Sequence, residues 1–146
     1  MSIAPAIFDW LGKYNIKSLL NTPCGSRDDC KLFRAHGIER IVGVNIREEV
    51  ASYPGHVVGD LCDWKPDGEW DAAYSNCFFC TSNDSRIGDH AAAAKNIASW
   101  PVRYIVFYDT PVFEWMTYFE QAGWKRIEYI NGMEGGMTRA ELWSKW

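Results

Sequence analysis

The order of apolar and polar residues predicts helices and strands that alternate along nearly the whole chain. Apolar residues recur at helical spacing in four segments, residues 3–14, 27–36, 87–100 and 111–122. Runs of apolar residues that predict strands fall at 16–22, 39–45, 56–60, 70–76 and 103–109. Two more strand-like runs, 125–130 and 137–143, are separated by a glycine-rich loop and predict a hairpin.

This alternation predicts an α/β sandwich built on a mainly parallel sheet. The run at 39–45 is continuously apolar, as expected for a parallel strand that is covered on both faces. Ligands bind such sheets beyond the carboxyl ends of the strands, where the strand order reverses. That edge would gather the turn at 21–28, the residues after Asn45, Asp60 and a loop at 76–86.

Length and composition narrow the class of protein. A chain of 146 residues with 47% hydrophobic residues fits a single domain spanning residues 1–146. The net charge of −4 argues against general neutralisation of phosphates, so nucleic acid is an unlikely partner. No apolar run approaches the roughly 20 residues of a membrane span, and the first ten residues do not resemble a signal peptide. We therefore expect a cytoplasmic protein without a membrane anchor.

The five cysteines are an odd number scattered through apolar segments, which is typical of reduced, buried thiols. Cys77 and Cys80 form a CxxC pair, and His90 follows ten residues later. A structural zinc site usually needs a second ligand pair at similar spacing, and the chain offers none. No metal is predicted.

A turn near residue 25 is the strongest local signal for a ligand site. The apolar run that begins at Ile16 stops at Pro23-Cys24-Gly25-Ser26, and a helix then begins. A glycine in such a turn lets a ligand approach the backbone, and the free amides of the new helix face that ligand. The turn is suited to a carboxylate or a ribose.

The order of these segments resembles the class I S-adenosylmethionine-dependent methyltransferases over nearly the whole chain. The segments that match the family's first four strand ends are 20–27, 43–47, 58–63 and 70–76. The resemblance implies a three-layer α/β sandwich with a mainly parallel seven-stranded sheet whose last strand is antiparallel. It also implies S-adenosylmethionine as the cofactor.

The resemblance assigns a role to individual residues around that cofactor. The first turn would approach the amino-acid part, through Asn21, Pro23, Cys24, Gly25 and Ser26. Asn45 would face the ribose and Ile46 the adenine plane, while Asp60 would accept a hydrogen bond from the adenine amino group near the Leu61 amide. Ser75 and Asn76 would meet the methionine end and the methyl acceptor.

Several positions depart from the family pattern. Asn21 replaces the loop acid, Pro23 and Arg27 replace two of its glycines, and Asn45 replaces the ribose-binding acid. A carboxamide can still donate and accept hydrogen bonds, but it lacks the charge that makes a carboxylate a strong acceptor. These replacements predict weaker binding of the cofactor or an altered orientation of it.

Simpler interpretations compete at each candidate position. Gly25 would serve only the turn, Asn45 would cap the next segment, and Asp60 would be an exposed loop acid. Methyl transfer is an in-line displacement at an activated methyl group, so a base is optional. His90, near the start of a predicted helix, is the best candidate for one, and a solvent-facing histidine is the alternative.

The sequence leaves the acceptor open between a small molecule, a glycan and a protein. Ser75-Asn76-Cys77-Phe78 stands where methyltransferases that act on DNA amino groups carry Asn-Pro-Pro-Tyr or Asp-Pro-Pro-Tyr, which disfavours that substrate. The chain lacks the insertions that build a lid, so its acceptor site would be open, completed by a second copy in a homodimer, or covered by a large acceptor.

Two further hypotheses remain. The chain could be a degenerate methyltransferase-like domain that binds a ligand or a partner protein without catalysis. Alternatively, the bound sulfonium could donate a group other than methyl.

Overall fold

The computed structural model describes residues 3–22, 27–46, 55–76, 79, 89–108, 113–130 and 140–145. Helices and strands alternate in this part of the chain, as the sequence pattern predicts. In chain order they are α1 (Pro5–Lys13), β1 (Ser18–Asn21), α2 (Arg27–Ala35), β2 (Arg40–Asn45), β3 (His56–Val58), β4 (Trp70–Asn76), α3 (His90–Ala98), β5 (Val102–Tyr108), α4 (Phe113–Gln121), β6 (Lys125–Ile130) and β7 (Ala140–Ser144).

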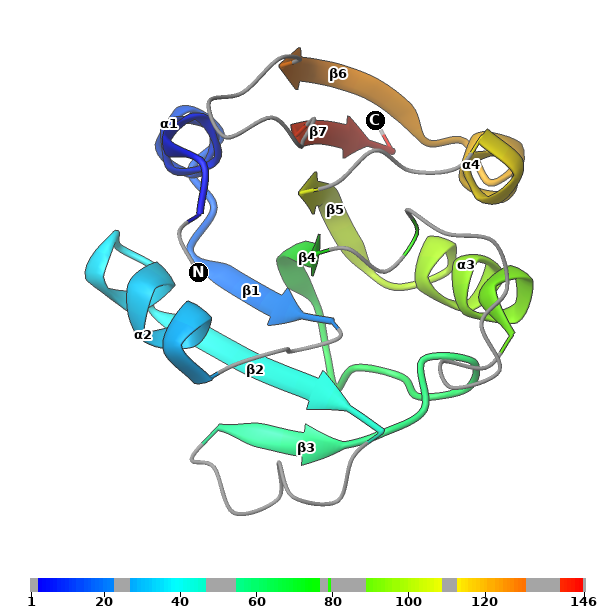
Figure 1. Cartoon of the computed structure of the whole chain (residues 1–146), viewed down its shortest axis with the longest axis horizontal. Helices are drawn as coiled ribbons and strands as arrows, with labels where there is room; N and C mark the ends of the chain where they lie inside the picture. The colour runs from blue at the N-terminus through cyan, green and yellow to red at the C-terminus, as the bar shows by residue number, and fades with distance from the viewer. Residues whose placement is uncertain are drawn as a thin grey trace.

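The strands form one seven-stranded sheet in the order β3-β2-β1-β4-β5-β7-β6 (Figure 1). The first five strands in this order pair in parallel, and β7 runs antiparallel to both β5 and β6. The predicted mainly parallel sheet with an antiparallel last strand is confirmed. Strand order reverses between β1 and β4, because the chain proceeds from β1 outward to β2 and β3, and from β4 outward to β5.

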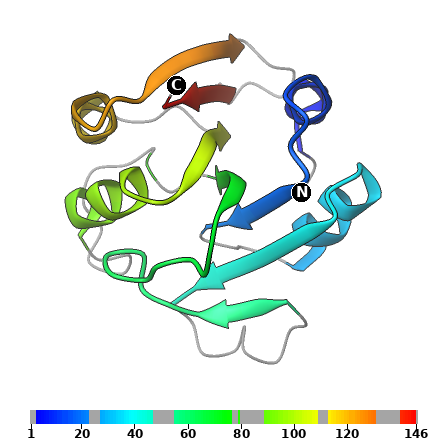
Figure 2. The ribbon, with the colours of Figure 1, turned by 180° about the vertical axis from the view of Figure 1, so that it is seen from behind.

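Helices cover the sheet on both faces, which gives the predicted three layers. Helices α1 and α2 lie on one face, and α3 and α4 on the other (Figures 1 and 2). Leu19 and Leu20 are consecutive in β1, so their side chains point to opposite faces and enter two separate buried cores. The central parallel strands therefore need apolar residues on both sides, which explains their continuous hydrophobic runs.

Local signals set the ends of the helices. Pro5 occupies the first turn of α1, where its missing amide is not needed. Asp89 caps α3 by accepting a hydrogen bond from the Ala92 amide at 3.1 Å. Gly37 and Gly123 follow α2 and α4 with φ of +97° and +96°, a conformation that favours glycine at a helix end.

Strand β3 is shorter than predicted. The sequence run extends to Asp60, but pairing with β2 ends at Val58. The Gly59 amide then donates to the Asn45 carbonyl at 2.9 Å, and a turn begins at Asp60. The chain leaves the sheet there because Asp60 accepts hydrogen bonds inside that turn instead of pairing with β2.

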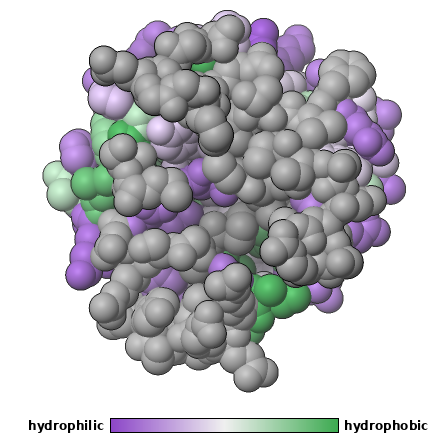
Figure 3. Space-filling model, viewed as in Figure 1, coloured by the Kyte–Doolittle hydropathy of each residue, from purple (hydrophilic) through white to green (hydrophobic). Residues whose placement is uncertain are grey.

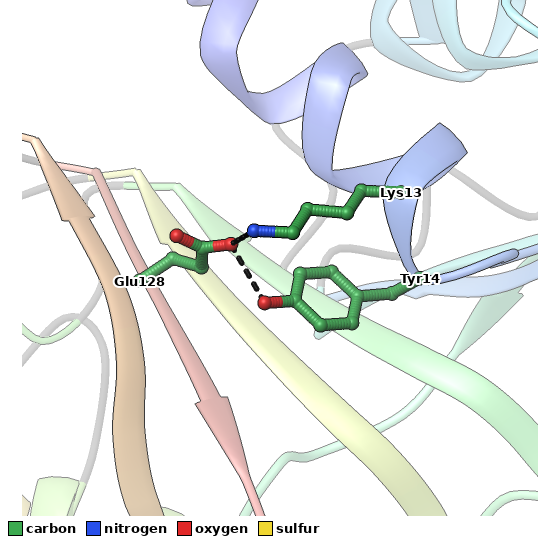
Figure 4. A network of polar contacts seen from close by, with 3 residues as sticks. All are labelled: Lys13, Tyr14 and Glu128. Carbon is green, nitrogen blue, oxygen red and sulfur yellow. Dashed lines mark hydrogen bonds and ion pairs between the residues drawn. The ribbon is translucent and has the colours of Figure 1, made fainter.

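A polar network ties α1 to the edge strand β6 (Figure 4). Lys13 Nζ and Tyr14 Oη each donate to Glu128 Oε2 at 2.6 Å. The hydrogen bond from Lys13, followed by the one from Tyr14, lowers the pKa of Glu128 below its ordinary value of 4.5. The charged carboxylate therefore stabilises the folded chain, and this contribution is lost as the pH falls through the lowered pKa.

Glu128→Gln should lower the melting temperature near pH 7 by about 1–3 °C, because exposed ion pairs contribute little. The difference from the wild type should shrink as the pH falls below 4.5, the ordinary pKa of a glutamate, and vanish once the pH has passed through the lowered pKa of folded Glu128. Thermal unfolding followed by circular dichroism at several pH values measures this. Glu120→Gln, on the exposed surface of α4, is the control. A deficit that stays constant down to pH 3 would contradict a role for the charge.

Candidate functional site

Three central strands end in asparagine at the edge where strand order reverses. Asn21 ends β1, Asn45 ends β2 and Asn76 ends β4. Asn21 is in register with Gly43 of β2 and Tyr74 of β4, and the other two asparagines follow these partners by two residues. Residues two apart on a strand face the same side, so all three asparagines lie on the face covered by α1 and α2.

Asn21 is held by helix α2. Its side chain is buried, with 1% exposure, and its Nδ2 donates to Cys30 Sγ at 3.7 Å. Asn21 Oδ1 has no hydrogen-bond partner in the described residues. An unsatisfied buried acceptor costs about 1–3 kcal/mol, so this oxygen is placed to receive a donor.

The thiol of Cys30 acts here as a hydrogen-bonding group. Burial raises the pKa of Cys30, although the Asn21 hydrogen bond opposes the shift. A thiol with a raised pKa stays protonated at neutral pH and is a poor nucleophile. The same sulfur lies 3.7 Å from His56 Nε2 at the start of β3, so the contacts join α2, β1 and β3.

A second buried oxygen lies on the opposite face of the sheet. Ser75 is buried near the end of β4, and its Oγ also has no hydrogen-bond partner among the described residues. It neighbours Tyr74, whose carbonyl accepts the Thr22 amide at 2.8 Å and prolongs the pairing of β1 with β4. Asn21 and Ser75 thus place one unsatisfied oxygen on each face of the sheet at the reversal of strand order.

An exposed apolar surface lies beside the asparagines. Ile46, directly after β2, is 54% exposed, and Val58 at the end of β3 is 43% exposed. Asn45 pairs with Val58, so the two apolar side chains belong to neighbouring chain segments. Hydrophobic atoms are visible over the ends of β2 and β3 (Figure 3). A flat apolar ring stacked on Ile46 would remove this side chain from water.

Asp60 begins a tight turn next to this surface. Its Oδ1 accepts the Cys62 amide at 2.9 Å, and its carbonyl accepts the amides of Asp63 and Trp64 at 3.0 and 2.7 Å. The side chain is exposed, whereas Leu61 is buried. Asp60 therefore organises the turn, as the simpler interpretation expects, and still presents its carboxylate to solvent.

His90 is not the solvent-facing residue that its place at a helix start suggested. Its exposure is 0%, and its ring stacks on Trp115 of α4 with centroids 5.4 Å apart and planes at 23°. The rings of Phe79 and His90 form an edge-to-face pair with centroids 6.3 Å apart. The solvent-facing alternative is wrong because the first turn of α3 packs against α4. A catalytic role for His90 stays a prediction.

Part of the predicted site lies outside the described residues. These positions are Pro23, Cys24, Gly25 and Ser26 of the first turn. Cys77 and Cys80, the CxxC pair for which no metal was predicted, also lie outside the described residues. In the described ranges no group of three or more His, Cys, Asp or Glu residues could hold a metal ion. No helix found there is long and apolar enough to cross a membrane.

Sequence reasoning missed the contact of Asn21, Cys30 and His56. No local pattern marks the contact, because 26 residues separate the cysteine from the histidine. Only the parallel pairing of β1, β2 and β3 brings them together.

The strand order, the antiparallel β7 and the helices on both faces define the class I methyltransferase fold. No model of a protein family matches the sequence, and a search of curated proteins gives no match. Similarity is found among solved structures.

Magnesium protoporphyrin IX methyltransferase (ChlM) from Synechocystis PCC 6803 with bound SAH is 12% identical, with a TM-score of 0.70 over 97% of this chain and 81% of that chain. An S-adenosylmethionine-dependent methyltransferase from Mesorhizobium loti is 12% identical, with a TM-score of 0.67 over 96% of each chain. The N-methyltransferase NodS from Bradyrhizobium japonicum WM9, in complex with S-adenosylhomocysteine (SAH), is 9% identical, with a TM-score of 0.65 over 95% of this chain and 85% of that one. At identities this low, the structural similarity establishes the fold alone.

Gly59→Ala should destabilise the protein by about 1–3 kcal/mol, the usual cost of forcing atoms into a packed site. A Cβ at Gly59 would lie 2.5 Å from Trp64 Cδ1, so the indole or the turn would have to move. Urea unfolding measures the loss. Gly12→Ala is the matched control, because no atom lies within 4 Å of its added Cβ, and alanine favours the helix there. Equal stabilities of the two variants would refute the packing argument.

Proposed function

We propose that the chain is an S-adenosylmethionine-dependent methyltransferase that acts by in-line methyl transfer. One observation carries this proposal: in a class I methyltransferase fold, the buried Asn21 oxygen, the exposed Ile46 and the exposed Asp60 carboxylate follow three successive strands of the sheet at one edge. These groups offer, in turn, a hydrogen-bond acceptor, an apolar plane and an anionic acceptor. Solved neighbours bind this cofactor or its product, since ChlM has been crystallised with SAM and NodS with SAH.

The proposed placement follows the edge of the sheet. The methionine part lies over the end of β1, where Asn21 Oδ1 accepts from its ammonium and the turn of Pro23, Cys24, Gly25 and Ser26 approaches its carboxylate. The ribose lies at Asn45. The adenine ring lies on Ile46, with its amino group donating to Asp60 and its ring nitrogen near the Leu61 amide.

The chemistry at the other end involves the end of β4. Ser75 and Asn76 face the sulfonium methyl group and the acceptor. A lone pair of the acceptor forms a bond to the methyl carbon while the carbon–sulfur bond breaks, and its electrons pass to sulfur to give SAH. The acceptor then loses its proton to solvent or to a base. His90 is the candidate base for an acceptor that must be deprotonated.

The carboxamides make the proposed cofactor site less negatively charged than one built with carboxylates. A carboxylate attracts the ammonium and accepts both ribose hydroxyls strongly, whereas an amide oxygen does so without net charge. Asn21 and Asn45 are therefore expected to bind the cofactor less tightly than acids would. The same argument supports the second candidate function, a domain that binds the ligand or a partner protein without turnover.

The acceptor is proposed only as a class: a small molecule, a glycan or a protein, with nucleic acid unlikely at a net charge of −4. A homodimer that completes the acceptor site and a cytoplasmic location belong to the same proposal.

Isothermal titration with SAH and with S-adenosylmethionine tests the proposal. Asp60→Ala should weaken SAH binding by about 10–100-fold, because it removes a hydrogen bond to a charged acceptor. Asp63→Ala, an exposed acid of the same turn, is the matched control and should change the affinity by less than about threefold.

The outcomes separate the hypotheses. Failure of the wild type to bind either ligand would refute the proposed cofactor. Binding of both ligands without transfer to any of a panel of acceptors would favour the non-catalytic domain. Mass spectrometry of the products identifies the transferred group, and a product other than SAH would show that the sulfonium donates something besides methyl.

A further inference from the structure

Asn96 connects helix α3, by hydrogen bonds, to the turn that begins at Asp60. Asn96 lies inside α3 and is buried, with 7% exposure. Its Nδ2 donates to the Leu61 carbonyl at 2.8 Å and to the Trp64 carbonyl at 2.7 Å, and its Oδ1 accepts from Lys65 Nζ. One side chain thus holds three residues of the segment that follows Asp60.

The chemistry of these partners determines how the carboxamide is oriented. Both amide hydrogens donate to carbonyl oxygens, and the amide oxygen accepts from an ammonium group. An amide rotated by half a turn would place its oxygen against the carbonyl oxygens and its NH2 group against the ammonium. Asparagine is also less favourable than alanine inside a helix. Its presence in the segment His-Ala-Ala-Ala-Ala-Lys-Asn-Ile-Ala is explained by the turn it holds rather than by the helix.

The hydrogen bonds within the turn do not connect it to the rest of the chain, so other contacts must fix its position. The amides of Cys62, Asp63 and Trp64 all donate to Asp60. Strand β3, which leads into the turn, has three residues and lies at the edge of the sheet. The turn is also hydrogen-bonded to residues at both ends of α3. At the N-terminal end the Cys62 thiol donates to the Asp89 carbonyl at 3.4 Å, and at the C-terminal end Lys65 contacts Ser99 at 3.2 Å and Trp100 Nε1 donates to the Trp64 carbonyl at 3.2 Å.

We propose that Asn96 is a positioning residue for recognition of the nucleobase, an inference that rests on the proposed function. By fixing the carbonyls of Leu61 and Trp64, it sets where the Asp60 carboxylate and the Leu61 amide stand relative to Ile46. These two groups match the edge of adenine, which donates from its amino group and accepts at the adjacent ring nitrogen. Hypoxanthine reverses both polarities, because it carries a carbonyl and a ring N–H there.

The test compares the affinities for SAH and for S-inosylhomocysteine by isothermal titration. The wild type should prefer SAH on the order of 100-fold, because a site built for one hydrogen-bond pattern rejects the reverse. Asn96→Ala should reduce this preference to about threefold or less, since the turn then relaxes. Asn96→Ser keeps one donor and should give an intermediate preference.

Controls separate positioning from a purely structural role. Lys95→Ala changes an exposed residue of the same helix and should keep the full preference. Asp60→Asn should lower the preference on its own, and adding Asn96→Ala to it should change the preference little further, because both act on the same contact. A loss of melting temperature in Asn96→Ala with an unchanged preference would overturn the proposal.

The remaining outcomes are also decisive. If Asn96→Ala does not fold, Asn96→Ser decides by the same ratio, and a preference equal to that of the wild type overturns the proposal. If the wild type binds SAH and S-inosylhomocysteine equally, the positioning role fails while the proposed cofactor stands. If the wild type binds no SAH, the proposed function itself fails.

Discussion

The pairing of β1 between β2 and β4 is the constraint on which the rest of this structure depends. Leu19 and Leu20 of that strand enter opposite cores, so β1 cannot sit at an edge or expose a face. The crossover from β1 to β2 places α2 on one face, and the crossover from β4 to β5, in the opposite direction along the sheet, places α3 on the other. The carboxyl ends of these parallel strands therefore meet at one edge. The asparagines, Ile46 and Asp60 share one edge of the sheet as a consequence of this pairing.

The three strand-ending asparagines add hydrogen-bonding groups to this edge without adding charge. Each carboxamide offers a donor and an acceptor, so its neighbours decide which one a ligand meets. At Asn21 the sulfur of Cys30 takes the donor and leaves the oxygen. A protonated thiol suits this task, because a charged residue at the buried Cys30 position would need its own partner. The raised pKa of Cys30 therefore supports the hydrogen-bonding role of Asn21.

Periodicity predicted the order and type of the elements because central parallel strands and amphipathic helices leave repeating patterns in the chain. It overestimated β3, because the predicted strand ran on to Asp60, whose hydrogen bonds form a turn, whereas Val58 is the last paired residue. The burial of His90 was also missed, since its cause is Trp115 on another helix. Asn96 left only a weak signal, a polar residue among alanines, and its partners lie more than 30 residues away. Such contacts follow from tertiary packing, which local sequence does not encode.

Helix α3 carries both Asn96, the proposed positioning residue, and His90, the candidate base. His90 in its first turn packs against Trp115, and Asn96 lies six residues later, a rise of about 9 Å along a helix. A capped helix of this length does not stretch, so the turn at Asp60 and the aromatic cluster around His90 stand at a fixed separation. A ligand whose base is recognised at Asp60 would then present its other end at a defined distance from His90. Under the proposed function, the position of the nucleobase therefore constrains where methyl transfer occurs.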